Sequence, residues 1–472
     1  MMKAMGVTRV WTDEQWAIID RSPAPTVIFA APGSGKTSVL VEHVAMQLVH
    51  RRIAPAELMA VTFTRQAALE MRRRLGRDRR VSGSQVESLR IGTFHALLFR
   101  WLAKAGVPVS IPLQGDEQRA LARKALAREG LHGPRYVRAF LSWMNRMKSV
   151  WPPVHPRPAW RGPREMRAFA RAGRTYEGAK TRMGRWDFDD IPITFARVLE
   201  EHPSLLTRTE RLAYLVVDEF QDTNPVEWHV VRALARTYQC PVFVVGDDDQ
   251  SIYGFRGASP RWLLEFGGVM GADPHWLSTN FRSDAEIVAR AERLIGHNRM
   301  RMPKRVRPAS SDPGSVCAFT AADEDEEARE VAAWLEDLRR RHPSWCFAVM
   351  ARTRLQLMRA WRVCREKVER VEWRTFHDGK GREWDAVAIV GAVEPNPYLA
   401  NQPETTAQWE EERRLFYVAL TRARHVCAIW TPVRVARQAV RPVRFVHEMG
   451  CEPDVGYPCA RRGWIKDGRH MH

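Results

Sequence analysis

Residues 26–37 read TVIFAAPGSGKT, and the helical pattern SVLVEHVAMQLV follows directly at residues 38–49. A short β-branched strand, a glycine-rich turn and a helix in this order are typical of a phosphate-binding loop. Gly33 and Gly35 let backbone N–H groups approach phosphate oxygens closely, and the helix N-terminus adds positive potential. The general pattern begins with Gly where this chain has Ala30, so the loop is a variant. The stretch therefore predicts a nucleotide-binding α/β domain.

Hydrolysis of a bound nucleotide needs a cation, a metal ligand and a base. In the loop, Lys36 would neutralise the β- and γ-phosphate charge and Thr37 would hold Mg²⁺. The apolar strand at residues 215–217 ends in Asp218 and Glu219. Asp218 is placed to hold Mg²⁺ and Glu219 to polarise the attacking water as general base. Such a pair alone is usually a helix cap or a solvated strand end, but the phosphate-binding loop upstream favours the catalytic interpretation.

A third polar strand end reads VGDDDQ at residues 245–250. Gln250 could reach a γ-phosphate and sense its loss. Gly and Asp are also common turn residues, and spacing alone does not decide between the two interpretations.

The order of strands and helices predicts the fold class. Short β-branched runs recur, each followed by a helical pattern, and this alternation is typical of parallel sheets covered by helices. The runs fall into two groups, before and after about residue 275, which indicates two α/β cores in tandem. The predicted strands are Thr26–Phe29, Met59–Thr62, Tyr214–Val217, Val242–Val245, Phe347–Ala351, Ala386–Val390 and Val426–Trp430.

Between about residues 99 and 185 the alternation of strands and helices stops, and the residue composition changes. Residues 113–147 read as helices rich in Ala and Arg, and residues 151–165 hold enough prolines to predict a loop or linker. We expect a helical insertion into the first core. In the second core, the acidic segment 323–330 is expected to open a helix that runs to about Arg341, since acidic residues favour a helix N-terminus.

The charge of the chain is strongly basic. Its 472 residues hold 74 Lys and Arg against 55 Asp and Glu, a net charge of +19 with a pI near 10.2. Such a surplus favours a polyanionic partner, nucleic acid first and an anionic membrane surface second. A generally Arg-rich composition is the simpler alternative.

Composition also bounds the cellular compartment. No run of about 18 apolar residues is present, so we expect no membrane span, and the N-terminal residues lack the apolar core of a signal peptide. The seven cysteines include no CxxC pair, which favours reduced thiols and a cytoplasmic location. The spacing of His447, Cys451 and Cys459 matches no common zinc pattern.

An ordered series of motifs resembles the UvrD/Rep/PcrA group of superfamily-one DNA helicases. It spans almost the whole chain in the order typical of that group. The motifs are TDEQ (12–15), APGSGKT (31–37), AVTFTRQAALEMRRRL (60–75), GTFHALLFR (92–100), WDFDDI (186–191), LVVDEFQDTN (215–224), VVGDDDQSIYGFRGA (244–258), LSTNFRS (277–283), HDGKGREW (377–384) and EERRLFYVALTRAR (411–424).

The resemblance implies residue roles at an ATP site. Gln15 would hydrogen-bond adenine, Phe281 would stack on it, and Glu383 would contact the ribose. Arg282 and Arg422 would reach the γ-phosphate from the second core and, with Lys36, Asp218, Glu219 and Gln250, form the predicted catalytic set. The predicted ATP-binding residues are Gln15, Ala30, Ala31, Pro32, Gly33, Ser34, Gly35, Lys36, Thr37, Ser38, Phe281, Arg282, Glu383 and Arg422, with Thr37 and Asp218 as Mg²⁺ ligands.

The resemblance also implies a single-strand channel lined by Phe63, Thr93, His95, Tyr253, Phe255 and Arg256. Aromatic rings suit this task because every base offers a π-face. Without the resemblance, core packing would be the better interpretation of these aromatics, and a structural role that of His95. The chain departs from the family at Phe255, where Trp is common, at Arg65-Gln66, and at Gly379 and Arg382.

We expect two RecA-like cores with ATP in the cleft between them, and Mg²⁺-ATP-driven 3′→5′ movement on single-stranded DNA. The expected parts are 1–98 with 186–276 (first core), 99–185 (insertion) and 277–472 (second core). Single/double-strand junctions and unidentified replication or repair proteins are the expected partners. The alternatives are a translocase that strips proteins from DNA and a catalytically silent nucleic-acid-binding module.

Two further expectations concern domains. The interval of about a hundred residues between the motifs of Arg282 and Glu383 is too short for the large mobile subdomain of full-size members, so we expect three parts and not four. About forty residues follow Trp430, too few for a nuclease domain of typical size.

Overall fold

The computed structural model describes residues 10–153, 164–365 and 369–455. The chain divides into two compact units. Unit 1 comprises Met1–Phe29, Lys36–Asp248 and Tyr253–Leu277, and unit 2 comprises Ala30–Gly35, Asp249–Ile252 and Ser278–His472. Two short stretches, Ala30–Gly35 and Asp249–Ile252, therefore group with unit 2 although their neighbours along the chain group with unit 1.

Unit 1 is built on a six-stranded sheet with the strand order β3-β2-β4-β5-β1-β6. The pairs among β1 to β5 are parallel, with Val27 opposite Val244 and Val61 opposite Val217. Their carboxyl ends therefore meet at one edge, the usual place for ligand-binding groups in such sheets. The strands are β1 (Thr26–Ala30), β2 (Leu58–Val61), β3 (Arg90–Gly92), β4 (Tyr214–Val217), β5 (Val242–Gly246) and β6 (Asp273–Leu277).

The helices of unit 1 begin at side-chain caps in several cases. Thr12, Ser82 and Asn224 each form a capping box that fixes where a helix starts. Around the sheet lie α1 (Asp13–Ile19), α2 (Lys36–Val49), α3 (Arg65–Arg77), α4 (Gly83–Ser88), α5 (Phe94–Lys104), α9 (Asp190–Glu201), α10 (Pro203–Thr207), α11 (Pro225–Tyr238) and α12 (Arg261–Met270), with short 3-10 turns at Pro55–Glu57, Phe220–Asp222, Asp248–Gln250 and Gly254–Arg256.

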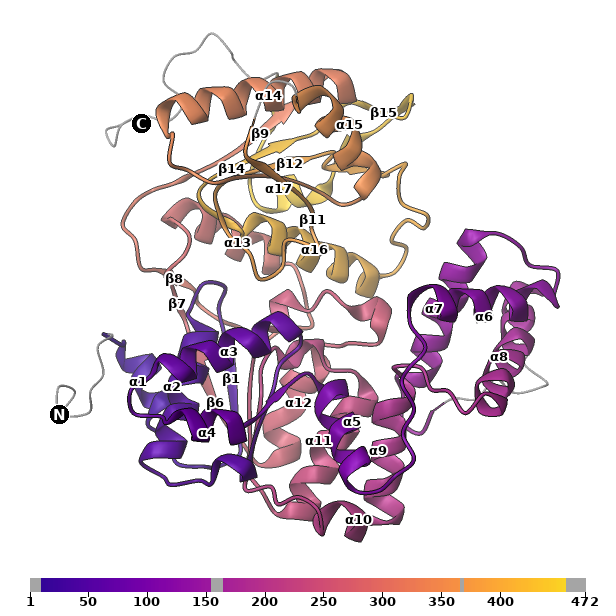
Figure 1. The fold of residues 1–472 in the computed structure, drawn as a ribbon. Helices are drawn as coiled ribbons and strands as arrows, with labels where there is room; N and C mark the ends of the chain where they lie inside the picture. The colour runs from indigo at the N-terminus through magenta and orange to yellow at the C-terminus, as the bar shows by residue number, and fades with distance from the viewer. Residues whose placement is uncertain (1–9, 154–163, 366–368, 456–472) are drawn as a thin grey trace. The chain divides into compact units, whose positions relative to one another are not determined.

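The predicted insertion contains α6 (Gly115–Ala127), α7 (Pro134–Lys148) and α8 (Arg164–Arg182), which pack around their own apolar core (Figure 1). Of the predicted loop 151–165, residues 154–163 lie outside the described part. The prediction is wrong for its last two residues, Arg164 and Glu165, which already belong to α8, because they follow the last proline of the stretch and no proline constrains them.

A buried ionic network lies where the insertion rejoins the sheet. The ammonium groups of Lys148 and Lys180 both bind the carboxylates of Asp187 and Asp190, at 2.6–2.9 Å. Burial alone would lower the pKa of Lys148, but the carboxylates of Asp187, Asp190 and Glu177 outweigh it and raise that pKa well above its usual value. The network thus joins α7 and α8 to the turn before α9, and removing one partner would leave a buried charge uncompensated.

Unit 2 holds a second six-stranded sheet with the order β11-β10-β12-β14-β9-β18, and every pair in it is parallel. Figure 1 shows α14 and α15 on one face and α13 and α16 on the other. The strands are β9 (Ser315–Thr320), β10 (Phe347–Ala351), β11 (Val371–Thr375), β12 (Trp384–Val390), β14 (Ala423–Trp430) and β18 (Asp454–Val455), and the helices α13 (Ala285–Ile295), α14 (Glu324–Arg341), α15 (Arg354–Cys364), α16 (Thr406–Leu420) and α17 (Arg444–Glu448).

Short strand pairs complete unit 2: β7 (Thr279–Asn280) with β8 (Arg307–Pro308), β13 (Val393–Glu394) with β17 (Arg441–Pro442), and β15 (Arg434–Val435) with β16 (Gln438–Ala439). The predicted α/β class with two parallel sheets is confirmed, and all seven predicted strands form. The acidic segment also opens a helix as expected, with the side chain of Asp323 capping α14. No helix in the described ranges has the length and apolar character needed to cross a membrane.

Candidate functional site

The phosphate-binding loop has the backbone that its glycines predict. Gly33 and Gly35 have φ angles of 67° and 79°, in the left-handed region that favours glycine. A Cβ atom at Gly33 would lie 2.6 Å from Asn280 Oδ1, so a larger residue does not fit. The backbone N–H of Phe281 donates to the carbonyl of Gly33 at 3.0 Å. The loop is therefore held in place within unit 2, and α2 begins with Lys36.

The predicted carboxylate pair lies at the carboxyl end of β4. Asp218 is buried, and its N–H donates to the carbonyl of Val61 at 2.9 Å. Glu219 has φ 52° and ψ 43°, a left-handed conformation that costs a non-glycine residue roughly 1–2 kcal/mol. Strain of this kind is tolerated where the surroundings fix a side chain for a task.

Gln221, which the sequence interpretation did not single out, orients Glu219. Its Nε2 donates to Glu219 Oε2 at 2.5 Å, while its Oε1 accepts from the N–H of Asp247 at 3.0 Å. A Cβ atom at Gly246 would lie 2.5 Å from Gln221 Oε1. The amide of Gln221 thus links the ends of β4 and β5, and its place inside the LVVDEFQDTN motif was the available signal.

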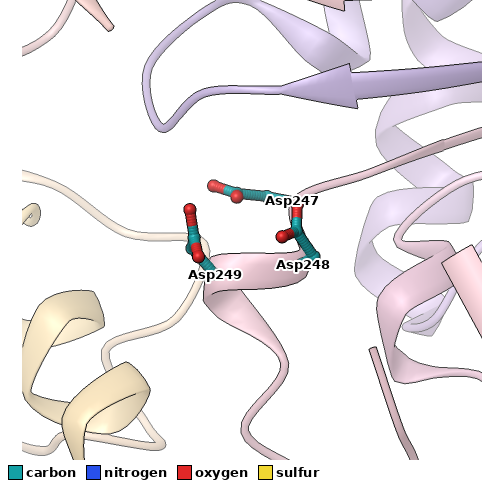
Figure 2. Close-up of side chains that lie close together, drawn as sticks. All are labelled: Asp247, Asp248 and Asp249. Carbon is teal, nitrogen blue, oxygen red and sulfur yellow. The ribbon is translucent and has the colours of Figure 1, made fainter. Parts of the chain in front are cut away.

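Three consecutive aspartates, Asp247, Asp248 and Asp249, follow β5 (Figure 2). The carboxylate of Asp249 is already bound by two cations, Arg301 and Lys304. Asp249 is therefore engaged in an ionic contact. The hydroxyl of Thr37 and the carboxylate of Asp218 are hard oxygen donors of the type that Mg²⁺ prefers, so they fit that ion.

Unit 2 brings together several predicted residues. Arg422 is only 2% exposed, and its Nη2 donates to Gln250 Oε1 at 3.1 Å. Arg282 Nε donates to Glu383 Oε2 at 2.6 Å, and Arg424 Nη2 donates to the other oxygen of that carboxylate at 2.6 Å. Burial would raise the pKa of Glu383, but these two guanidinium groups outweigh it and lower that pKa to about 2. Glu383 is therefore ionised at any physiological pH.

The remaining predicted nucleotide contacts have partners of their own. Gln15 Oε1 accepts from the N–H of Thr12 at 3.2 Å and so caps α1, a structural role beside the predicted adenine contact. Ser38 Oγ accepts from Arg74 Nη1 at 3.0 Å, which makes Arg74 a further basic group at the start of α2 that the sequence did not reveal. Phe281 is 50% exposed, as a ring available for stacking must be.

A pocket of about 660 Å³ in unit 1 collects most of the predicted channel residues. The rings of Phe63 and Tyr253 stack with their centroids 4.8 Å apart, and the guanidinium of Arg256 lies over Phe63 at 5.8 Å. Thr93 and His95 also line this pocket. Phe255 does not line it, but contacts Tyr253 edge-on at 5.9 Å and is itself 50% exposed.

The wall of this pocket carries both signs of charge. Its basic members are Arg65, Arg100, Lys148 and Arg256, and its acidic members are Asp189, Asp222 and Glu227. Burial raises the pKa of Glu227 to about 7, and burial together with Asp187 raises that of Asp189 to about 7. Burial and the charge of Arg256 lower the pKa of His95 to about 4, so this ring is neutral at physiological pH.

Two family profiles match this chain. The profile of the UvrD/REP helicase N-terminal domain matches residues 11–269, and that of the UvrD-like helicase C-terminal domain matches residues 355–431. Among similar proteins, the putative ATP-dependent DNA helicase YjcD of Bacillus subtilis (strain 168) is 31% identical over 335 residues, which cover 69% of this chain and 43% of the relative.

Two further relatives match to a similar extent. DNA helicase II of Escherichia coli (strain K12) is 31% identical over 327 residues, covering 68% of this chain and 45% of the relative. The ATP-dependent DNA helicase PcrA of Leuconostoc citreum is 29% identical over 367 residues, covering 75% of this chain and 48% of the relative. The chain thus spans less than half the length of each of these curated relatives.

Proposed function

The chain belongs to the UvrD/REP helicase family, and on this premise we propose that it is an ATP-dependent DNA helicase or translocase that moves 3′→5′ along single-stranded DNA. One observation carries the proposal furthest. The segment after β5 holds Gln250, bound to Arg422, and three residues later Tyr253, stacked on Phe63 in the pocket of unit 1. A γ-phosphate sensor and a base-stacking ring on one short segment suit a motor that couples the two ligands.

The proposed reaction is hydrolysis of the terminal phosphoanhydride of ATP. A water oxygen bonds to the γ-phosphorus, the bond to the bridging oxygen breaks, and ADP and phosphate form. Glu219, oriented by Gln221, accepts the water proton, and Lys36 with Arg282 and Arg422 neutralises charge on the phosphoryl oxygens. Thr37 and Asp218 would hold Mg²⁺, which neutralises phosphate charge when bound.

The decisive experiment measures ATP turnover with and without single-stranded DNA, followed by translocation polarity on strands labelled at either end. Stimulated turnover with 3′→5′ movement supports the proposal. Turnover that is indifferent to DNA would contradict it. Strand displacement measured beside displacement of a bound protein separates a helicase from a translocase that strips proteins, and a protein without turnover would be the silent binding module.

The proposal extends to the parts of the chain. We propose the three parts 1–98 with 186–276, 99–185 and 277–472, and a location in the cytoplasm with single/double-strand junctions as substrates. Between residues 284 and 376 the described elements are α13, β8, β9, α14, β10, α15 and β11, and β9, β10 and β11 are strands of the second sheet. This arrangement supports a motor without a separate domain inserted there.

Replacing Tyr253 by Ala is expected to weaken single-strand binding by about 1–3 kcal/mol, because the ring would lose its stacking with a base. Binding is expected to tolerate any sequence, and the logarithm of the affinity should fall linearly with the logarithm of salt concentration, since basic groups in the pocket release counterions from phosphate. Fluorescence anisotropy with a labelled oligonucleotide measures both. Trp276→Ala, which removes a half-exposed ring elsewhere in unit 1, is the control. If the folded Tyr253→Ala protein binds the oligonucleotide as tightly as the unaltered protein, the ring of Tyr253 only packs within unit 1.

Single-strand binding is also expected to weaken as pH rises from about 6 to about 8. Over this range Glu227 and Asp189, whose raised pKa values lie near 7, become ionised and repel phosphate, while His95 stays neutral. The loss is roughly 1 kcal/mol of binding free energy.

The matching variants test the cause of this pH dependence. Glu227→Gln and Asp189→Asn should flatten it, whereas Glu165→Gln, on the exposed start of α8, should not. If the variant that carries both Glu227→Gln and Asp189→Asn binds single strands with an unchanged pH dependence, these two carboxyl groups are not its cause.

The raised pKa values of Glu227 and Asp189 also affect stability. They make the free energy of unfolding fall as pH rises from about 4 to about 7, because the folded state holds these protons to higher pH than the unfolded state does.

A further inference from the structure

Four residues of the chain, Asp249–Ile252, group with unit 2, while the residues on either side of them group with unit 1. All four side chains are buried, and Asp249 and Ile252 have no measurable exposure. Because the chain on both sides of this stretch belongs to unit 1, the stretch needs contacts with unit 2 to stay there. Three such attachments, among the described residues, hold Asp249 and Gln250.

The first attachment is a buried ionic contact at Asp249, whose side chain is drawn in Figure 2. Arg301 Nε donates to Asp249 Oδ1 at 3.0 Å and Arg301 Nη2 donates to Oδ2 at 2.9 Å, which forms a bidentate fork. Lys304 Nζ lies 3.1 Å from Oδ2, with the lysine side chain 2% exposed. Bidentate, charge-assisted contacts fix geometry more strongly than a single neutral hydrogen bond does.

The other two attachments hold the neighbouring residue, Gln250. Lys380 Nζ donates to its backbone carbonyl at 2.9 Å, and Arg422 Nη2 donates to its side-chain Oε1 at 3.1 Å. The position of the Gln250 amide therefore depends on Asp249 on one side and on Arg422 on the other.

The stretch that carries Arg301 and Lys304 is itself tied to α16, the helix that leads to Arg422. Glu410, within α16, accepts from the N–H of Arg299 at 2.8 Å, and Arg414 Nη2 donates to the carbonyl of Met300 at 2.7 Å. The stretch with Arg301 and Lys304 thus contacts α16, and Gln250, next to Asp249, contacts Arg422, which follows α16. Both partners of the ionic contact are therefore tied to the helix that positions the predicted γ-phosphate arginine.

We propose that Arg301 and Lys304 are positioning residues that anchor Asp249, and that this anchor links the state of Gln250 and Arg422 to the ring of Tyr253, which follows Ile252 directly along the chain. The inference rests on the proposed function. Neither residue touches nucleotide or DNA in this scheme. They hold the segment in place, so that a change at Gln250 is passed to Tyr253, three residues later, and is not lost in local rearrangement.

The test uses the full chain with Arg301→Met, Lys304→Met and the double variant. Arg305→Met, an exposed arginine one residue beyond Lys304, is the matched control. Arg301→Lys keeps the charge but loses the fork. Four quantities are measured: melting temperature, turnover without DNA, the factor by which single-stranded DNA stimulates turnover, and nucleotides moved per ATP.

The anchor predicts that the double variant keeps its DNA-independent turnover and loses about tenfold in stimulation, with fewer nucleotides moved per ATP. Arg301→Lys should recover part of the loss, and Arg305→Met should match the unaltered protein. Equal stimulation and stepping in a folded double variant would overturn the anchor. A parallel fall of basal and stimulated turnover with the melting temperature would also overturn it, because it marks a structural role. If the unaltered protein shows no DNA stimulation, the proposed function itself fails, which is a distinguishable result.

Discussion

Replacement of Glu219 by Gln is expected to lower ATP turnover by about 10²- to 10⁴-fold while nucleotide binding is retained. The amide keeps the size of the side chain but cannot accept the water proton. Asp218, the predicted metal ligand, and the phosphate-binding loop remain intact. Steady-state turnover and binding of a fluorescent nucleotide analogue, measured on the same preparation, separate the two effects.

Two further variants serve as controls for the Glu219→Gln protein. Glu201→Gln, at the exposed end of α9, should turn over ATP normally. Lys36→Ala should lose nucleotide binding or turnover, since it removes the cation proposed to bind the phosphates. Turnover at the normal rate by the Glu219→Gln protein would show that another group is the base.

The second large effect is expected at the arginines of unit 2. Arg282→Ala and Arg422→Ala should each lower turnover by about a thousandfold or more while sparing DNA binding, because arginines that contact the transferred phosphoryl group stabilise its transition-state charge. Arg282→Ala is the cleaner variant, since Glu383 keeps its contact with Arg424. Arg422 is buried, and its loss leaves Gln250 Oε1 and the carbonyl of Val418 without this donor.

Arg422→Lys is therefore needed beside Arg422→Ala, because it keeps a positive charge in the buried position. Arg340→Ala, on the exposed face of α14, controls for loss of an arginine as such. Melting curves exclude unfolding. Near-normal DNA-stimulated turnover in Arg282→Ala would remove this arginine from the phosphoryl site.

The sequence predicted the strands whose residues are buried on both faces, because a continuous β-branched run such as residues 242–245 has few other structures open to it. It missed β6 and β11, which carry polar residues such as Asp273 and Glu372 and are mostly exposed or half-buried. It also missed β3, which has only three residues. In these strands the neighbouring chain, not the local pattern, decides the conformation.

The predicted site residues follow from motifs, but the contacts that orient them do not. Glu219 depends on Gln221, and Asp249 depends on Arg301, which lies 52 positions away. Arg301 is one of many arginines in this basic chain, and no local pattern distinguishes it. Only the folded arrangement shows which arginines meet a buried carboxylate.

The left-handed backbone at Glu219 has a consequence for anyone who engineers this protein. Glycine adopts that conformation without the steric penalty, so a Glu219→Gly substitution would relieve roughly 1 kcal/mol of strain. With Glu219 as the proposed base, a library sorted only by melting temperature would therefore enrich a variant that is more heat-resistant and no longer turns over ATP. Selections on this protein need a turnover assay beside the thermal one, because at this position heat resistance and activity favour different residues.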